Sequence, residues 1–313
     1  MKFLRIRFEY MLTRYATLFM ESLPFELAWL MGRTVGFLTY VFDFRHRRVG
    51  ERNLRRVYPE MTDREIRSML LRVYDHLGKV TVEMVRAPRM FGKAAKKVNT
   101  NGSLNGVSRY LTLKNFERVR EVCSKGRGAI FVTAHLGNWE FSGSAMALLG
   151  IPLYSVARTM DNPLLDKYIT KLREIRGQKI LKKHGSIRQA LTLLRSGHRL
   201  GIVVDQNAPV DNVFVDFLGK KAAVVRGVAS LAVKTGCVIL PGYSYRTNNS
   251  PHHVVVAGTP IEVPEEGNRE EKIYKITQQY CGMIEGWIKE HPEQWLWIHN
   301  RWKTRPPEEN PNG

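Results

Sequence analysis

The chain is 313 residues long, so it can bury a large hydrophobic core as one domain, with or without a smaller appendage. A hydrophobic fraction of 43% is typical of globular proteins and excludes an intrinsically disordered chain and a polytopic membrane protein. Lys and Arg number 49 against 29 Asp and Glu, and the net charge of +20 favours polyanions: nucleic acid, anionic lipid headgroups or an acidic carrier protein.

The motifs of the sequence argue against a nucleic-acid partner and against a metal site. The sequence contains no helix-turn-helix, zinc-finger or RNP-type aromatic motif, so we expect no nucleic-acid partner. Cys123, Cys237 and Cys281 are scattered and show no CxxC or Cys/His spacing. We therefore expect reduced thiols, no metal site and a cytosol-facing protein.

Residues 1–45 mix basic residues with aromatic and apolar runs, and no charge-free run exceeds nine residues. A membrane-spanning helix needs about 20 mostly apolar residues, and a central Arg costs roughly 2.5–3.5 kcal/mol. We predict an N-terminal membrane-associating segment of one or two amphipathic helices at 1–45, supported by the basic stretch Arg45–Arg48 that follows. The alternative is a pair of ordinary core helices broken at Pro24.

Residues 46–313 are predicted to form the second unit, an α/β domain with a helical lead-in to about residue 105. In the lead-in, Pro59 ends one helix, and Thr62 with Glu65 forms a capping-box pattern that begins the next. That second helix carries apolar residues at core spacing: Ile66, Leu70, Val73 and Leu77.

From Tyr110 onward, strands and helices alternate. This order predicts an α/β fold with a mixed, largely parallel sheet flanked by helices, in which ligands gather at the carboxyl ends of the strands. The sequence has no GxGxxG or GxxxxGK[ST] motif, so we expect no nucleotide cofactor. We predict strands at 129–134, 153–157, 179–181, 200–205, 238–241, 243–246 and 253–257, and helices at 115–123, 139–149, 163–176, 187–194, 227–234 and 269–290.

The segment 129–140 brings a histidine and a glutamate to a strand end. The apolar run Ile130–Val132 predicts a buried strand, and a helix begins at Trp139. On one continuous helix, His135 and Glu140 would lie roughly 140° apart, so they can meet only if His135 precedes the helix and the chain turns back at 137–138. Asn138 is then a candidate N-cap. The pair predicts a general base with a carboxylate that fixes its tautomer, although a lone histidine is more often structural.

Other polar residues also follow predicted strands. Arg158, Arg176, Asp205 and Gln206 are candidates for substrate binding, together with Asn138. Arg158 could equally be a surface cation and Asp205 a turn former. The sequence has no GxSxG elbow for a Ser-His-Asp hydrolase and no second ligand at zinc spacing from His135. A base that acts directly on a substrate hydroxyl is the simplest use of the pair.

Four stretches, in order, resemble a known family. The sequence TAHLGNWE at 133–140 resembles the HxxxxE motif of the bacterial lipid A late (secondary) acyltransferases, which belong to the lysophospholipid acyltransferase superfamily. NLRRVYPE at 53–60, LGIVVDQN at 200–207 and the Trp-rich PEQWLWIHNRWKTRP at 292–306 are similar to further segments of that family. The resemblance covers nearly the whole chain.

The resemblance implies an acyl-carrier-protein-dependent O-acyltransferase in lipopolysaccharide biosynthesis. Such an enzyme transfers a fatty acyl chain from the carrier-protein thioester, or from acyl-CoA, to a hydroxyl of an anionic Kdo-lipid A precursor. It works without metal or other cofactor at the cytoplasmic side of the bacterial inner membrane. By this resemblance His135 is the general base, Glu140 its orienting carboxylate and Asp205 the acid of the family's Asp-Gln pair. Arg176 matches the family's arginine, and Arg158 is the other candidate.

Three alternatives stay open. The acceptor could be a lysophospholipid or another glycolipid, since one superfamily serves all of these. The chain could also be a non-catalytic basic protein that binds anionic membranes. Finally, Trp295, Trp297 and Trp302, with Arg301 and Arg305, fit a protein core with a polar rim as well as they fit contact with lipid headgroups.

Overall fold

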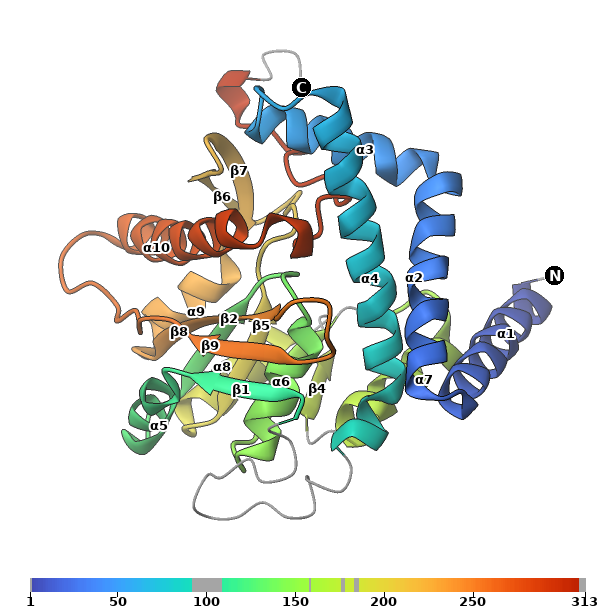
Figure 1. Ribbon diagram of the computed structural model, residues 1–313. Coiled ribbons are helices and arrows are strands. Elements are labelled where there is room, and N and C mark those ends of the chain that lie inside the picture. The colour runs from blue at the N-terminus through green and yellow to red at the C-terminus, as the bar shows by residue number, and fades with distance from the viewer. Residues whose placement is uncertain (1, 92–108, 158, 176–177, 183–185, 310–313) are drawn as a thin grey trace.

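The structure is a computed structural model that describes residues 2–91, 109–157, 159–175, 178–182 and 186–309 (Figure 1). Its centre is a seven-stranded sheet in the order β1-β9-β8-β2-β5-β3-β4. Every neighbouring pair in it is parallel except β8 and β9, so the predicted mixed, largely parallel sheet is confirmed. The strands are β1 Leu111–Lys114, β2 Ala129–Thr133, β3 Leu153–Ala157, β4 Gln178–Lys182, β5 Arg199–Val203, β8 Val238–Arg246 and β9 His253–Ala257.

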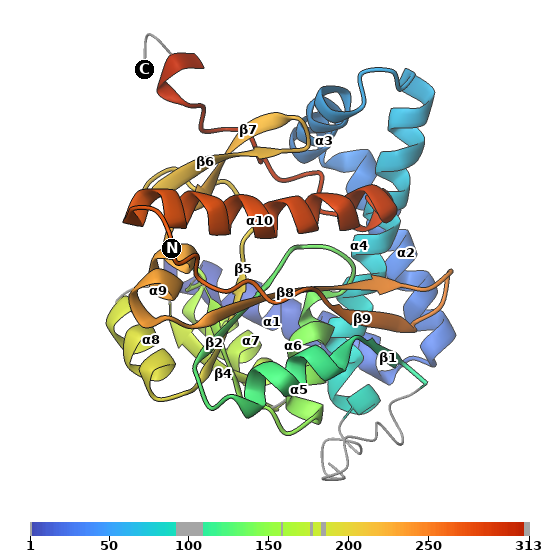
Figure 2. The ribbon, with the colours of Figure 1, turned by 90° about the vertical axis from the view of Figure 1, so that its left-hand side faces the viewer.

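Helices cover both faces of this sheet, as expected for an α/β fold. Figure 2 shows α10 above the sheet and α5 and α6 below it. The helices of this part are α5 Phe116–Ser124, α6 Trp139–Leu148, α7 Pro163–Ile175, α8 Ser186–Arg195, α9 Gly227–Thr235 and α10 Arg269–Glu290. Each matches a helix predicted from the sequence within one residue at both ends.

Four strands differ from the sequence prediction. β1 was not predicted, and the two short strands expected at 238–241 and 243–246 are one continuous strand, β8. The antiparallel hairpin of β6 (Asn212–Phe217) and β7 (Lys220–Val225) was also not predicted, and it packs on α10. Its two-residue turn has Leu218 at φ +52° and Gly219 at φ +74°, and leucine rarely adopts this conformation.

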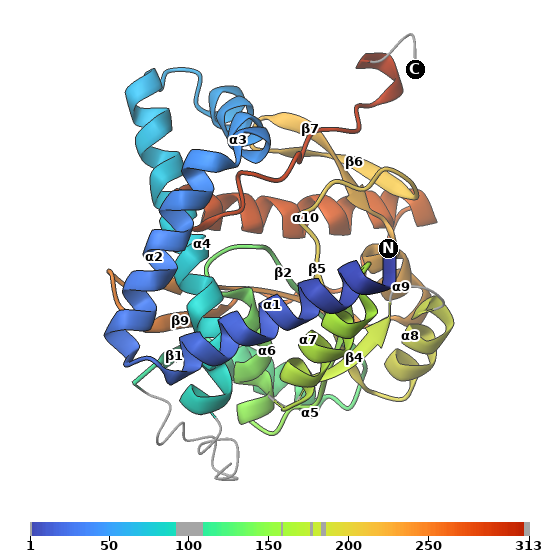
Figure 3. The same ribbon diagram turned by 90° about the vertical axis from the view of Figure 1, so that its right-hand side faces the viewer.

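Four helices precede the sheet: α1 Lys2–Ser22, α2 Phe25–Phe42, α3 Phe44–Val57 and α4 Asp63–Phe91. The predicted helix end near Pro59 and the capping box are both present, since Thr62 Oγ1 accepts from the Glu65 N–H and the Glu65 carboxylate accepts from the Thr62 N–H. In Figures 1 and 3, α2 lies beside α4, and Figure 3 shows α1 running across α7, which it contacts.

The α2–α4 contact is a close backbone approach. A Cβ on Gly78 of α4 would lie 2.0 Å from the carbonyl oxygen of Gly32 on α2, so only glycine fits there. The helices α1 and α2 are therefore packed against the rest of the chain along one side, while many of their apolar side chains remain exposed, among them Phe3, Phe8 and Leu12 of α1. Within the described residues, no helix is both long enough and apolar enough to cross a membrane.

The Trp-rich segment near the C-terminus is part of the core. Trp295, Trp297 and Trp302 are 2%, 0% and 2% exposed, so the alternative of headgroup contact is wrong for these three side chains. Arg301 is also buried; it donates from Nη1 to the carbonyl oxygen of Ala223 at 2.6 Å and lies over the ring of Phe217. The segment thus closes the core between the sheet, the hairpin and α4.

Candidate active site

His135 follows β2 in the middle of the sheet, between β5 and β8. Because β2 and β5 are parallel with Thr133 opposite Val203, both chains leave the sheet at the same edge. The Val204 N–H still donates to the Thr133 carbonyl, which extends the pairing by one residue. This register places Asp205, from the loop after β5, directly beside His135.

The Asp205 carboxylate holds His135 at two atoms. Nδ1 of His135 lies 2.7 Å from Oδ1 of Asp205, and the His135 backbone N–H donates to Oδ2 at 2.8 Å. The indole Nε1–H of Trp295 donates to the same Oδ2 at 2.7 Å. With Asp205 5% exposed and three donors on its two oxygens, the carboxylate is both buried and fixed.

This contact sets the chemistry of the imidazole. Nδ1 carries the proton that it donates to Asp205, so Nε2 is left with a free lone pair. The amide nitrogen of Gln206, which is exposed, lies 3.5 Å from Nε2. Burial works to lower the pKa of His135, but the charge and hydrogen bond of Asp205, with the charge of Glu140, raise the pKa above its usual value. Burial works to raise the pKa of Asp205, and His135 and Trp295 lower it.

The structure corrects the expected partner of His135. The carboxylate that fixes the tautomer is Asp205, whereas Glu140 influences the imidazole through its charge. Glu140 is 5% exposed at the start of α6 and receives a paired guanidinium contact from Arg173 of α7, with Nη2 at 2.6 Å and Nε at 3.1 Å from Oε1. The His135–Glu140 spacing suggested a contact because the two residues are near in sequence. The sheet instead places Asp205, which is distant in sequence, beside the imidazole.

The turn between His135 and α6 is fixed from three sides. Gly137 has φ +59°, and a Cβ there would lie 2.0 Å from the carbonyl oxygen of Ser244 on β8. The Gly137 N–H donates to the Gln294 carbonyl, the Leu296 N–H donates to the His135 carbonyl, and the ring of His76 lies with Nε2 3.1 Å from the Gly137 carbonyl. Burial lowers the pKa of His76 to about 3, so its ring is neutral and donates to that carbonyl.

Asn138 occupies the N-cap position of α6, as predicted, but its side chain does not cap the helix. Its Nδ2 donates instead to Glu83 of α4 at 2.9 Å. Glu83 is fully buried and also binds Arg246 through both Nη atoms and Nε2 of His253 at 3.1 Å. Burial works to raise the pKa of Glu83, but His253 and Arg246 lower it to about 2, so the cluster contains a true buried ion pair.

The C-terminal segment forms a second support. The Asn207 N–H, two residues after Asp205, donates to Nε2 of His299 at 3.0 Å. Asn207 and Thr304 exchange two further hydrogen bonds, each 3.0 Å long. Nδ2 of Asn53, on α3, donates to the carbonyl oxygens of Trp297 and His299. The stretches 53–60 and 200–207 thus both contact the C-terminal stretch 292–306, and 133–140 contacts the latter two through Asp205 and Gln294.

The remaining predicted site residues divide into two groups. His135, Asn138, Glu140, Asp205 and Gln206 lie together at one sheet edge, whereas Arg158 and Arg176 fall outside the described residues. Sequence reasoning did not find Arg173 or Glu83, because each lies within an ordinary helical pattern. Trp295 was noticed, but its indole contact with Asp205 depends on the fold. In the part of the chain that the structure describes, no group of three His, Cys, Asp or Glu side chains could hold a metal ion.

The chain is similar to the proteins of one known family. The family model "Bacterial lipid A biosynthesis acyltransferase" matches residues 4–304. The chain belongs to this family. It is an acyltransferase, so the alternative of a non-catalytic membrane-binding protein does not hold.

Its relatives in this family are distant in sequence but matched over most of their length. The chain is 25% identical over 287 residues to the lipid A biosynthesis lauroyltransferase of Escherichia coli, covering 91% of this chain and 88% of that protein. It is 23% identical over 288 residues to the E. coli lipid A biosynthesis palmitoleoyltransferase, with the same shares of 91% and 88%.

Two further similarities lie outside the lipid A enzymes. A phosphatidylinositol mannoside acyltransferase of Mycolicibacterium smegmatis is 24% identical over 182 residues, which is 56% of this chain and 57% of that protein. Among solved structures, the 1-acyl-sn-glycerophosphate acyltransferase of Thermotoga maritima aligns with a TM-score of 0.39 and 15% identity, covering 86% of this chain and 98% of that one.

Proposed function

We propose that this acyltransferase moves a fatty acyl chain from an acyl-carrier-protein thioester to a hydroxyl of a Kdo-lipid A precursor, with His135 as general base. The observation that carries the proposal is the geometry of His135: a carboxylate holds Nδ1, and Nε2 is left as a base. The names of the relatives support the lipid A precursor as acceptor. Acyl-CoA is the alternative donor, since it presents the same thioester.

The chemistry needs one proton acceptor. Nε2 of His135 removes the proton of the acceptor hydroxyl as its oxygen attacks the thioester carbonyl, a form of assistance worth about 10²–10⁴ in rate. The C–O bond forms first; then the C–S bond of the tetrahedral intermediate breaks. The departing thiolate takes the proton back from the imidazolium, which Asp205 has stabilised in the meantime. Base and ester product are regenerated without any other reactant.

Neighbouring groups supply the remaining requirements. The tetrahedral oxyanion needs hydrogen-bond donors, and the backbone N–H groups in the first turn of α6 are aimed along the positive end of that helix. The Gly137 N–H is not one of them, because it donates to Gln294. Arg158 and Arg176 are proposed to bind substrate phosphates, and Asn138 and Glu140 to shape the site through Glu83 and Arg173.

The reaction is proposed to take place at the cytoplasmic face of the inner membrane. The net charge of +20 suits an anionic membrane, a phosphorylated lipid and an acidic carrier protein alike. Apolar side chains are exposed along α1 and α2, for example Leu4, Phe8 and Phe19 of α1 at 70%, 67% and 58%. This face supports the prediction that residues 1–45 associate with the membrane by lying on it.

A glycolipid other than a lipid A precursor is the second candidate acceptor. The phosphatidylinositol mannoside acyltransferase of M. smegmatis supports it, because that relative matches 56% of this chain. The two candidates share the mechanism and differ only in what occupies the acceptor site.

The test is a transfer assay with the purified protein, acyl-carrier-protein thioesters of several chain lengths, and Kdo2-lipid IVA beside lysophosphatidic acid and phosphatidylinositol mannoside. Mass spectrometry is expected to show one added acyl group on Kdo2-lipid IVA, and His135→Ala is expected to abolish it. His46→Ala is the matched control, since His46 is an exposed histidine whose Nδ1 also lies 2.8 Å from a carboxylate, that of Asp43. Acylation of the mannoside alone would support the second candidate, and full activity in His135→Ala would refute the mechanism.

A further inference from the structure

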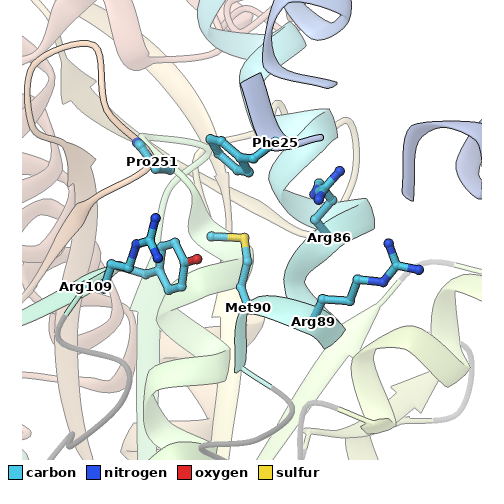
Figure 4. Close-up of a pocket in the computed structure, with 7 residues that line it drawn as sticks. Phe25, Arg86, Arg89, Met90, Arg109 and Pro251 are labelled. Carbon is cyan, nitrogen blue, oxygen red and sulfur yellow. The ribbon is translucent and has the colours of Figure 1, made fainter. Parts of the chain in front are cut away.

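A cavity of about 260 Å³ lies at the end of α4, beside the α1–α2 turn and the start of β1 (Figure 4). Figure 4 shows Arg86 and Arg109 on opposite sides of Phe25 and Met90. The residues that line the cavity combine an apolar wall with three cations: Phe25, Met90, Tyr110, Pro251, Arg86, Arg89 and Arg109.

Two of the three arginines also have a structural role. Arg86 donates from Nη1 to the carbonyl oxygens of Met20 and Leu23, and Arg89 donates to the carbonyl oxygen of Glu21. These contacts neutralise the carbonyl end of α1, which is a common use of cations near a helix C-terminus. They do not explain Arg109, which comes from the chain before β1.

The charges at the cavity are not balanced. The Glu21 carboxylate, 3.9 Å from Nη2 of Arg89, is paired with one of the three guanidinium groups. Among the described residues, no ion pair involves Arg86 or Arg109. Arg109 is exposed, and its guanidinium lies 5.6 Å from the centre of the Tyr110 ring. Three cations against one carboxylate leave two positive charges in excess around an apolar wall.

The cavity is on the same edge of the sheet as His135. β1 is parallel to β9, β9 is antiparallel to β8, and β8 is parallel to β2. The start of β1 therefore lies at the edge where β2 ends.

A chain of contacts also joins the two places. Phe25 packs on Trp29, Trp29 packs under Arg246, and Arg246 pairs with Glu83, which binds Asn138.

We propose that this cavity binds the phosphate of an anionic lipid headgroup. Guanidinium groups suit phosphate because they donate paired hydrogen bonds to its oxygens, and the apolar wall suits the glycerol or sugar carbons beside it. The exposed apolar faces of α1 and α2 begin at this same turn, so the acyl chains of the bound lipid lie along them. The phosphate belongs either to the lipid acceptor or to a phospholipid of the bilayer; the second source does not depend on the proposed function.

The binding test uses the full-length protein and water-soluble dihexanoyl phosphatidic acid, with dihexanoyl phosphatidylcholine for comparison, measured by calorimetry. We expect tighter binding of the phosphatidic acid and a loss of about fivefold in Arg109→Gln, which corresponds to about 1 kcal/mol for one exposed charge pair. Arg109→Gln removes no hydrogen bond of the described chain. Arg195→Gln, an exposed arginine on α8, is the control and is expected to bind like the wild type.

Two further measurements identify the source of the phosphate. A raised KM for the lipid acceptor in Arg109→Gln, with unchanged kcat, assigns the cavity to the acceptor. Weaker partition onto vesicles containing phosphatidylglycerol, with unchanged KM, assigns it to a bilayer lipid. Equal affinity of wild type and Arg109→Gln for dihexanoyl phosphatidic acid overturns the proposal, whether or not the protein transfers acyl chains.

Discussion

His135 is held by a carboxylate that is itself held by the fold. Asp205 receives its donors from the imidazole, from the His135 backbone and from the indole of Trp295. A buried carboxylate with all donors in place cannot rotate, so the imidazole ring cannot rotate either. The precision of the base therefore depends on residues 70 and 160 positions away in the sequence (205 and 295).

Asp205→Asn is expected to lower the rate of acyl transfer by about 10²–10⁴, most of the contribution of the base, since an amide no longer stabilises the imidazolium or selects its tautomer. The measurement is kcat with saturating donor and acceptor. Asp216→Asn is the matched control: Asp216 is exposed and pairs with Lys221, so its loss is expected to leave kcat unchanged. A loss below tenfold in Asp205→Asn would show that another group orients His135.

The pH dependence of transfer follows from the raised pKa of His135. The base acts only when neutral, so activity rises with pH through the pKa of His135, and the midpoint of this rise is expected above 6.5. In Asp205→Asn burial still lowers the pKa, while the opposing carboxylate is gone, so the midpoint moves to lower pH. The profile of kcat/KM from pH 5 to 9, measured for the wild type and for Asp205→Asn, checks both midpoints. A midpoint at higher pH in the variant would contradict the role of Asp205 as the carboxylate that raises the pKa of His135.

Gly137→Ala is expected to abolish transfer and to destabilise the fold by more than the usual cost of a left-handed alanine, about 1–2 kcal/mol. The added Cβ would meet the Ser244 carbonyl at 2.0 Å, so β8 or the His135 turn must move. Gly236→Ala separates the two effects, because Gly236 has φ +66° but open space around its Cβ. Denaturant unfolding of both variants measures the loss in the free energy of unfolding. Equal losses in the two variants would show that the turn at Gly137 tolerates a side chain.

At the scale of elements, the sequence predicts most of the fold and only part of the site. A helix was predicted over residues 269–290, and α10 is observed over the same residues; in the structure Asn268 and Glu271 form a capping box at its start. The β6–β7 hairpin was missed because its turn places Leu218 at φ +52°, where Glu285 of α10 accepts from its N–H.

The site was predicted only in part because its contacts join separate elements. The sequence identified His135, Glu140 and Asp205, but it assigned the wrong carboxylate to the imidazole. β2 and β5 are neighbours in the sheet although β3 and β4 lie between them in the sequence. Local sequence patterns do not reveal this strand order. Arg173 and Trp295 were unassigned for the same reason: each reaches the site from a separate element.

The Glu83 cluster ties α4, α6, β8 and β9 together beneath the site. Glu83→Gln keeps the shape but leaves the buried guanidinium of Arg246 without its counter-charge, so we expect a loss of about 3–5 kcal/mol in the free energy of unfolding. Chemical denaturation measures it. Glu121→Gln, which removes an exposed pair with Lys125, is the control and is expected to change stability by less than about 1 kcal/mol. Equal stability of the two variants would show that the cluster is not an ion pair.

At the scale of the molecule, exposed apolar surface is concentrated at one end of the chain. Of the 20 exposed large apolar side chains in the described residues, 14 lie on α1 and α2. A soluble protein scatters such residues singly, whereas a concentration of this kind marks a surface that is covered in use. Since α2 packs on α4 through glycines, this surface is rigidly attached to the element that carries Glu83.

Replacing Phe8 and Leu12 of α1 together by Gln is expected to weaken binding to anionic vesicles by at least about tenfold. Each side chain contributes roughly 1.5–3 kcal/mol when fully buried in an apolar environment, and a partly inserted pair retains enough of this to exceed about 1.4 kcal/mol. The two residues lie one helical turn apart and are 67% and 60% exposed, so the change removes membrane contact and little of the core. Vesicle co-sedimentation measures the partition, and kcat with saturating detergent-dispersed acceptor is expected to stay unchanged, because His135 and Asp205 lie on other elements. The matched control is the pair Ile187→Gln and Val210→Gln, which are 61% and 76% exposed elsewhere on the molecule. If the control pair lowers vesicle binding as much as the α1 pair, the membrane also meets another face, and the proposal that residues 1–45 form the membrane-binding surface is wrong.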